Sequence, residues 1–197
     1  MNSMFYGASA FNQNINKQTV TVNGKTYTAW DTSIVNDMGL MFNRANSFNG
    51  DISNWDVSTV GNMSQMFQWA NNFNQDIGNW DVSSVTTMNN MFGNNSAFNQ
   101  SIENWNPSSA TDMDNMFDGG VYNQPINWNT TSLTTAQSMF PSNFNQIVNL
   151  NTSKITTMKQ MFYQCDHFNQ NINTKVVTTA NGTSFVAWDT SIVTDMS

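Results

Sequence analysis

Hydrophobic and polar positions along the chain repeat with a period close to 25 residues. The clearest copy, WDVSSVTTMNNMFGNNSAFNQ, covers residues 80–100. From the second copy onward, a Trp or, once, Leu150 stands 11 residues before a Met-Phe pair. Such self-similarity indicates stacked repeat units, each of which buries its apolar face against its neighbours. The Met-Phe pairs begin at Met4, Met41, Met66, Met91, Met116, Met139 and Met161.

Two apolar periods alternate within one unit. Over residues 57–70 the apolar positions recur mainly every three residues, which predicts one face of a short helix. Ser58 precedes this run and is suited to cap the helix N-terminus. Over residues 73–77 apolar and polar positions alternate, as in a strand. The pattern therefore predicts an α/β solenoid of about seven 22–25-residue strand–helix turns.

Two units are longer than the rest and divide the single repeat array 1–197. Long units cover residues 1–37 and 158–196, and regular units cover 38–157. Each long unit carries an insert in which β-branched and polar residues flank Asn-Gly, the strongest local signal for a β-hairpin. We expect both hairpins to project and to carry specific contacts, because projecting loops on rigid scaffolds commonly do so. The candidate contact residues are Asn23, Gly24, Tyr27, Asn181, Gly182 and Phe185.

An Asn follows the second aromatic residue of every unit. One interpretation is a structural ladder in which each side chain bonds the units above and below, as amides do in cross-β stacks. The other is a row of ligand contacts, and the regularity of the pattern favours the ladder. These residues are Asn12, Asn49, Asn74, Asn99, Asn123, Asn145 and Asn169.

In four units an Asp directly follows the repeated Trp, which we call the Trp marker, and such carboxylates are candidate ligands for a metal ion. Asp31, Asp56, Asp81 and Asp189 occupy this position. Carboxylates one strand spacing apart could hold Ca²⁺, which takes six to eight oxygen ligands. Asn replaces Asp in three other units, however, and this favours a role in turns and caps. We therefore expect no cofactor, with Ca²⁺ as the alternative.

Charge and composition exclude several partners. The formal net charge is −7 with only six Lys and Arg, so the chain lacks the basic patch that nucleic acids and anionic lipids require. No apolar run is long enough to cross a membrane. The N-terminal residues do not form a signal peptide, and we expect the chain to be part of a longer one. Cys165 is the only cysteine, so an internal disulfide is impossible.

No set of residues predicts catalysis. Cys165 and His167 are close in sequence, but nucleophile and base normally come from distant segments. Asp51 and Asp76 occupy equivalent positions, yet nothing indicates the cleft that paired carboxylates need. Trp69 is the one tryptophan that does not occupy the repeated Trp position of a unit, and we expect it to be an exposed aromatic contact.

The string FNQDIGNWDVSSVTTMNNMF at residues 73–92 resembles the repeat of BspA-like bacterial surface proteins, which also occurs in mycoplasma lipoproteins. The resemblance covers essentially the whole chain. It implies a leucine-rich-repeat-like coil, exposure at the cell surface, adhesion in some members and no enzyme activity. The chain departs from the pattern in its two hairpin inserts and in the shortened units over residues 121–151.

Two functions follow as expectations. The first is a non-enzymatic extracellular module that binds a protein or glycan, or that acts as a spacer stalk. The second is a subunit or segment of a filament. The array starts and stops in the same phase without polar caps, and uncapped ends could bind other copies end to end.

Overall fold

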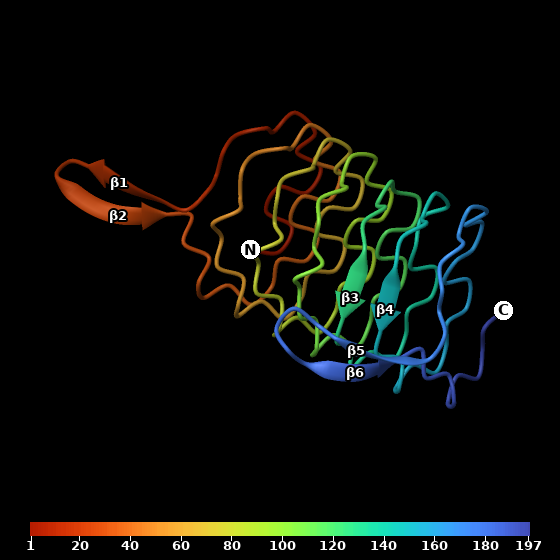
Figure 1. Ribbon diagram of the computed structural model, residues 1–197. Coiled ribbons are helices and arrows are strands. Elements are labelled where there is room, and N and C mark those ends of the chain that lie inside the picture. Colours follow the sequence, from red (N-terminus) through yellow and green to blue (C-terminus); the bar gives the residue numbers. More distant parts are fainter.

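The computed structural model describes residues 1–197 and contains six short strands and no helix. The prediction of an α/β solenoid with strand–helix turns is therefore wrong, and so is its leucine-rich-repeat-like description. The chain instead forms a stack of irregular coils, and the C-terminus lies at the opposite end of the stack from the first hairpin (Figure 1). The strands are β1 (Gln18–Val22), β2 (Lys25–Ala29), β3 (Ile126–Trp128), β4 (Val148–Leu150), β5 (Lys175–Thr178) and β6 (Ser184–Ala187).

A series of four-residue β-turns replaces the predicted helix. The backbone N–H groups of Val60, Met66 and Ala70 each donate to a carbonyl three residues earlier. Such turns place every third side chain on the inside, which produces the same apolar spacing as a helix face. The intervening N–H groups of Met63, Gln65, Phe67 and Trp69 donate to carbonyls of the next coil, at distances of 2.9 to 3.1 Å. Because these donors bond between coils, the i to i−4 bonds of a helix cannot form.

Two positions in most coils adopt left-handed backbone conformations, which also interrupt any helix. One precedes the Met of the Met-Phe pair, as at Leu40 and Gln65, and the other lies two residues after its Phe, as at Arg44 and Trp69. A non-glycine residue in this region costs on the order of 1 kcal/mol. The bond from the Gln65 N–H to the next coil, 2.9 Å long, offsets this cost.

One residue of each coil also forms a parallel bridge with the equivalent residue of the next coil. A single bridge per coil is too short to count as a strand, so most of the stack has no regular sheet. The bridged residues follow one another from the second coil to the last: Asp37, Asn62, Thr87, Asp112, Thr135, Thr157 and Asp195.

Two columns of stacked aromatic rings form the centre of the core. One column contains the Phe of each Met-Phe pair, with ring centroids 5.1 to 6.4 Å apart between coils. The other contains the aromatic residue before each ladder Asn, and the two rings of one coil lie 3.9 to 4.3 Å apart. Met side chains and the Trp indoles fill the remaining space, and 45 buried hydrophobic residues form one continuous core.

The Trp indoles replace the strand pairing that was predicted at residues 73–77. The Nε1–H of Trp80 donates to the Ile52 carbonyl of the preceding coil at 3.3 Å, and Trp105 donates likewise to Ile77 at 3.0 Å. The Leu150 side chain has no N–H group to donate. At that coil the backbones pair directly instead, as the parallel strands β3 and β4.

Both predicted hairpins are confirmed, but they differ in placement. β1 and β2 pair antiparallel around Asn23 and Gly24, which adopt φ angles of 53° and 72°. β5 and β6 also pair antiparallel, with Gly182 at φ 84° in a longer loop. The β1–β2 hairpin projects away from the stack, whereas β5–β6 folds back along the stack beside β3 and β4 (Figure 1).

Candidate functional site

The asparagine column forms a continuous chain of hydrogen bonds between coils. The side-chain oxygen of Asn74 accepts the backbone N–H of Asn99 at 3.0 Å, while the Asn74 N–H donates to the side chain of Asn49 at 2.9 Å. The same side-chain-to-backbone bond joins every neighbouring pair at 2.8 to 3.0 Å. The acceptor oxygens are thus occupied within the protein. The column runs through Asn12, Asn49, Asn74, Asn99, Asn123, Asn145 and Asn169.

The acidic residues after the Trp markers are engaged in local turns. A carboxylate oxygen of Asp56 accepts both the backbone N–H and the hydroxyl of Ser58, at 3.1 and 2.6 Å. These bonds favour the charged form and hold the pKa of Asp56 below its usual value, and Ser191 does the same for Asp189. Asp31 and Asp81 accept the N–H of the serine two residues later in the same way. No group of three or more His, Cys, Asp or Glu side chains is arranged to hold a metal ion.

The β1–β2 hairpin presents an exposed surface with little charge. The Tyr27 side chain, at its centre, is 48% exposed, and Val22 beside the tip is also exposed. The only salt bridge of the protein lies at the base of this hairpin, where Lys17 Nζ is 3.1 Å from an Asp31 carboxylate oxygen. Asn23 and Gly24 form the tip. The hairpin therefore offers apolar side chains and two strands with unpaired outer edges.

The β5–β6 hairpin is packed against the stack. Phe185 occupies the position equivalent to Tyr27 but is only 7% exposed, and Ala187 bridges to Asn151. The Asn127 side chain donates to the Thr178 carbonyl at 3.4 Å, which joins the hairpin to β3. One face of the hairpin and the loop with Asn181 and Gly182 remain exposed, as Val176 and Val186 show. Phe185 is therefore a core residue here, unavailable to a partner.

Trp69 lies on one flank of the stack, and its side chain is 41% exposed. It adopts a left-handed conformation with φ 61°, and its backbone N–H donates to Gly93 of the next coil at 3.1 Å. Arg44, Asn94 and Gly119 occupy the equivalent position in neighbouring coils. The indole is thus a single aromatic group among polar and small residues.

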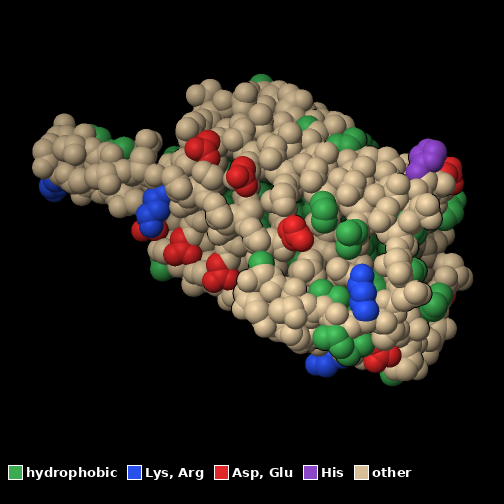
Figure 2. Space-filling model, in the orientation of Figure 1, with side chains coloured by type: hydrophobic (Ala, Val, Ile, Leu, Met, Phe, Trp, Pro, Cys, Tyr) green, Lys and Arg blue, Asp and Glu red, His purple; other side chains and the backbone are tan.

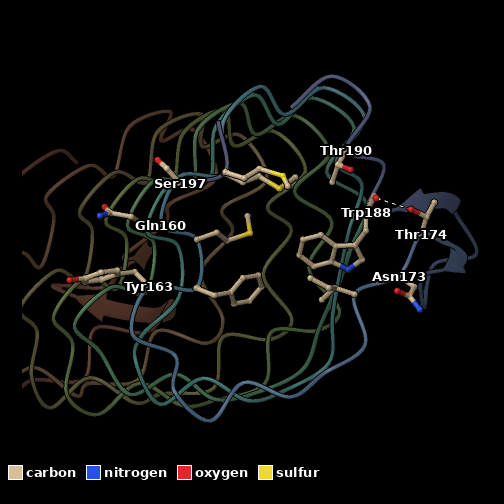
Figure 3. Close-up of a pocket in the computed structure, with 12 residues that line it drawn as sticks. Gln160, Tyr163, Asn173, Thr174, Trp188, Thr190 and Ser197 are labelled. Carbon is tan, nitrogen blue, oxygen red and sulfur yellow. Dashed lines mark hydrogen bonds between the residues drawn. The ribbon is translucent and has the colours of Figure 1, made fainter. Parts of the chain in front are cut away.

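The last coil leaves an apolar hollow at the end of the stack, shown in Figure 3. It has a volume of about 540 Å³, and Met158, Met161, Phe162 and Trp188 line its apolar part. Equivalent side chains in inner coils are covered by the following coil. Thr174, whose hydroxyl donates to the Trp188 carbonyl at 2.9 Å, contributes to the polar rim.

A second hollow was missed by the sequence reasoning. It is a polar notch of about 330 Å³ on the side of the stack, between the loops that contain Asp118 and Tyr163. The sequence signal for this notch is the spacing between two aromatic positions, namely the Phe of the Met-Phe pair and the aromatic residue before the ladder Asn. Phe140 and Phe144 are four residues apart, whereas Phe92 and Phe98 are six apart.

Cys165 and His167 do not form a catalytic pair. The Cys165 thiol donates to the Pro141 carbonyl at 3.2 Å, and burial raises its pKa, which disfavours the reactive thiolate. His167 is exposed. Figure 2 shows this histidine at the surface of a face on which charged side chains are few and scattered.

Comparison with known proteins identifies a family. The model of a family described as a Mycoplasma protein of unknown function, DUF285, matches residues 1–29, 17–127 and 96–186. These overlapping stretches together reach from the first coil into the β5–β6 hairpin. No curated protein and no solved structure matches the chain. The structure also offers no helix with the length and apolar character needed to cross a bilayer.

Proposed function

This chain belongs to the DUF285 family, and from that premise we propose that it is a non-enzymatic repeat scaffold of the BspA-like type that acts in adhesion outside the cell. The observation that carries the proposal is the contrast between a rigid core and one projecting hairpin. Stacked aromatic columns and ladders hold the coils, while β1–β2 extends into solvent with Tyr27 exposed. Recognition elements are commonly loops displayed on a rigid scaffold in this way.

The hairpin is suited to bind an extended protein segment. β1 and β2 form an isolated two-stranded sheet, so their outer edges carry backbone groups that can pair with a further strand. Val22 and Tyr27 supply apolar surface beside these edges. The net charge of −7 disfavours nucleic acid and anionic membranes as partners.

Binding to a panel of immobilised extracellular-matrix proteins, measured by biolayer interferometry, tests the proposal. We expect the intact chain to bind at least one panel member and the variant carrying Val22→Ser with Tyr27→Ser to bind at least about tenfold more weakly. The matched control is Val186→Ser, which changes an exposed valine of the β5–β6 hairpin. Equal binding by the intact chain and the β1–β2 variant, or no binding by either, would refute the proposal that this hairpin mediates adhesion.

End-to-end association is a second candidate, favoured by the apolar hollow at the last coil. Phe162 is only partly buried there and Met196 is exposed, and in a solution of this chain only a second copy can supply a covering coil. A head-to-tail contact of this kind extends into a fibre unless its rotation closes a ring. Light scattering over a dilution series, with electron microscopy, separates rods of about 35 Å, at ~4.8 Å per coil, from growing fibres. Monomers at every concentration would exclude this function.

A further inference from the structure

The polar notch arises where one loop of the stack is shortened. This loop joins the Phe of the Met-Phe pair to the aromatic residue before the ladder Asn. It contains three residues, 141–143, in the coil of Phe140, but five residues, 163–167, in the coil of Phe162. Because each coil lies directly on the next, a short loop leaves a gap between longer neighbours. Ser142 of the short loop, Asp118 of the preceding coil and Tyr163 of the following coil line this gap of about 330 Å³. The volume falls at the lower end of the range for small-molecule sites, roughly 300–1,000 Å³.

The short loop is held in place. Its Pro141 carbonyl accepts the Cys165 thiol at 3.2 Å, and its Asn143 side chain donates to the Val121 carbonyl at 3.3 Å. Phe140, at the start of the loop, is stacked between Phe117 and Phe162. The notch is therefore a preformed feature, and a ligand need not order the loop in order to bind.

Four polar side chains in the notch have no hydrogen-bond partner within the protein, whereas Gln164 Nε2 donates to the Tyr163 hydroxyl at 3.5 Å. Asp118, Ser138, Ser142 and Gln160 form no side-chain hydrogen bond in the structure. This distinguishes the notch from the asparagine ladder and from the turn aspartates, whose oxygens are occupied. One aromatic ring completes the lining, because Tyr163 is 58% exposed. In Figure 3 the side chains of Tyr163 and Gln160 lie on the outer side of the coil and point away from its interior.

We propose that this notch binds a neutral oligosaccharide. The C–H face of a pyranose ring packs on the Tyr163 ring, which combines an apolar face with a polar hydroxyl. Two adjacent sugar hydroxyls donate to the Asp118 carboxylate, and the hydroxyls of Ser138 and Ser142 and the amide of Gln160 supply further donors and acceptors. The lining contains no Lys or Arg to balance an anionic sugar. This site is separate from the β1–β2 hairpin, so either proposal can fail without the other.

Saturation-transfer NMR and titration calorimetry on the full chain test the proposal. The probes are maltotriose, lactose and N,N′,N″-triacetylchitotriose, with 3′-sialyllactose as the charged counterpart of lactose. We expect at least one neutral probe to bind with a Kd on the order of 1 mM, and sialyllactose to bind more weakly than lactose. Absence of binding by all three neutral probes at about 10 mM, or tighter binding of sialyllactose than of lactose, would overturn the assignment.

Two variants locate the binding site. Tyr163→Ala should weaken binding at least about tenfold, because stacking provides much of the contact. Tyr6→Ala is the matched control: Tyr6 follows the Phe of the first Met-Phe pair, as Tyr163 follows the last, and is 53% exposed away from the notch. Equal losses in the two variants, or no loss in Tyr163→Ala, would show that the sugar binds elsewhere.

A loop exchange tests the origin of the notch. Replacing residues 141–143 with the five residues Gly-Asn-Asn-Ser-Ala of 93–97 restores the six-residue spacing of the fourth coil. The exchanged loop should fold, because the same segment already fits between stacked coils, and it should fill the notch and abolish binding. An unchanged thermal unfolding profile with retained sugar binding would refute the proposal. If the exchanged chain does not fold, the Tyr163→Ala and Tyr6→Ala pair decides it.

Discussion

Replacing Asn74 tests how the asparagine ladder joins the coils. In the structure the Asn74 side chain contributes its oxygen, which accepts the backbone N–H of Asn99 at 3.0 Å. No bond from its amide nitrogen is part of the ladder. Asn74→Asp keeps the acceptor in a side chain of the same shape, whereas Asn74→Ala removes it. The two variants therefore separate a side-chain-to-backbone ladder from a stack of side-chain amides bonded to one another.

The expected magnitudes follow from the loss of one hydrogen bond. A protein hydrogen bond contributes about 0.5–1.5 kcal/mol net, and water can reach the exposed Asn99 N–H in part. We expect Asn74→Ala to lower the free energy of unfolding by about 1 kcal/mol and Tm by roughly 2–4 °C for a chain of this size. At pH 7, Asn74→Asp should stay within about 0.5 kcal/mol of the parent, since its carboxylate accepts the same N–H.

Thermal and urea unfolding followed by circular dichroism measure these differences. Asn79→Ala serves as the control, because Asn79 is an exposed asparagine of the same coil with no hydrogen bond from its side chain. It should leave Tm within about 1 °C. If Asn74→Asp destabilises as much as Asn74→Ala, the amide hydrogens carry the ladder and the assignment of the bonds is wrong.

Three further predictions concern the indoles, the hairpins and the turn carboxylates. Trp105→Leu removes the indole bond to the Ile77 carbonyl, which keeps only the Trp80 N–H, and vacates buried volume, so it should cost about 2–4 kcal/mol in urea unfolding. Phe185→Ala should cost about 3 kcal/mol, whereas Tyr27→Ala, at the equivalent but exposed position, should cost under about 0.5 kcal/mol. Since Ser58 lowers the folded-state pKa of Asp56, the stabilisation is present above the unfolded pKa of about 4 and is lost as pH falls through the folded value. Below pH 4, Tm should therefore fall less in Asp56→Asn than in the parent.

The sequence predicts the repeat register better than the backbone within each repeat. Markers such as Trp80 and Met91 align with equivalent core positions in neighbouring coils, and Asn-Gly locates the turn of the β1–β2 hairpin. A three-residue apolar period, however, suits both a helix face and a series of β-turns that repeat every three residues. The choice between them depends on where the N–H groups of residues such as Gln65 bond, and their partners lie in another coil. That information is absent from any single repeat.

The two hairpins show that the sequence of a repeat does not predict which of its side chains are exposed. Tyr27 and Phe185 occupy equivalent positions and were both predicted as contacts. Phe185 is buried because β3 and β4 lie beneath its hairpin, and Tyr27 is exposed because its hairpin points away from the stack. Both hairpins carry Asn-Gly at the turn and an aromatic residue three positions before the Trp, so the local pattern does not separate them. Exposure, and hence availability for binding, is decided by the neighbouring coils.

Both of the proposed binding surfaces lie where the repeat changes in length. From residue 30 to residue 161 the spacing between the Trp marker and the following Met is constant, because this piece contains the bridge and the indole contact that fix the register. Any change of length there would displace every coil that follows. Insertions and deletions are confined to segments outside it, where they produce a projecting hairpin at 18–29 and a notch beside Ser142. The similar repeats build the scaffold, and the departures from the repeat create the two surfaces that we propose as binding sites.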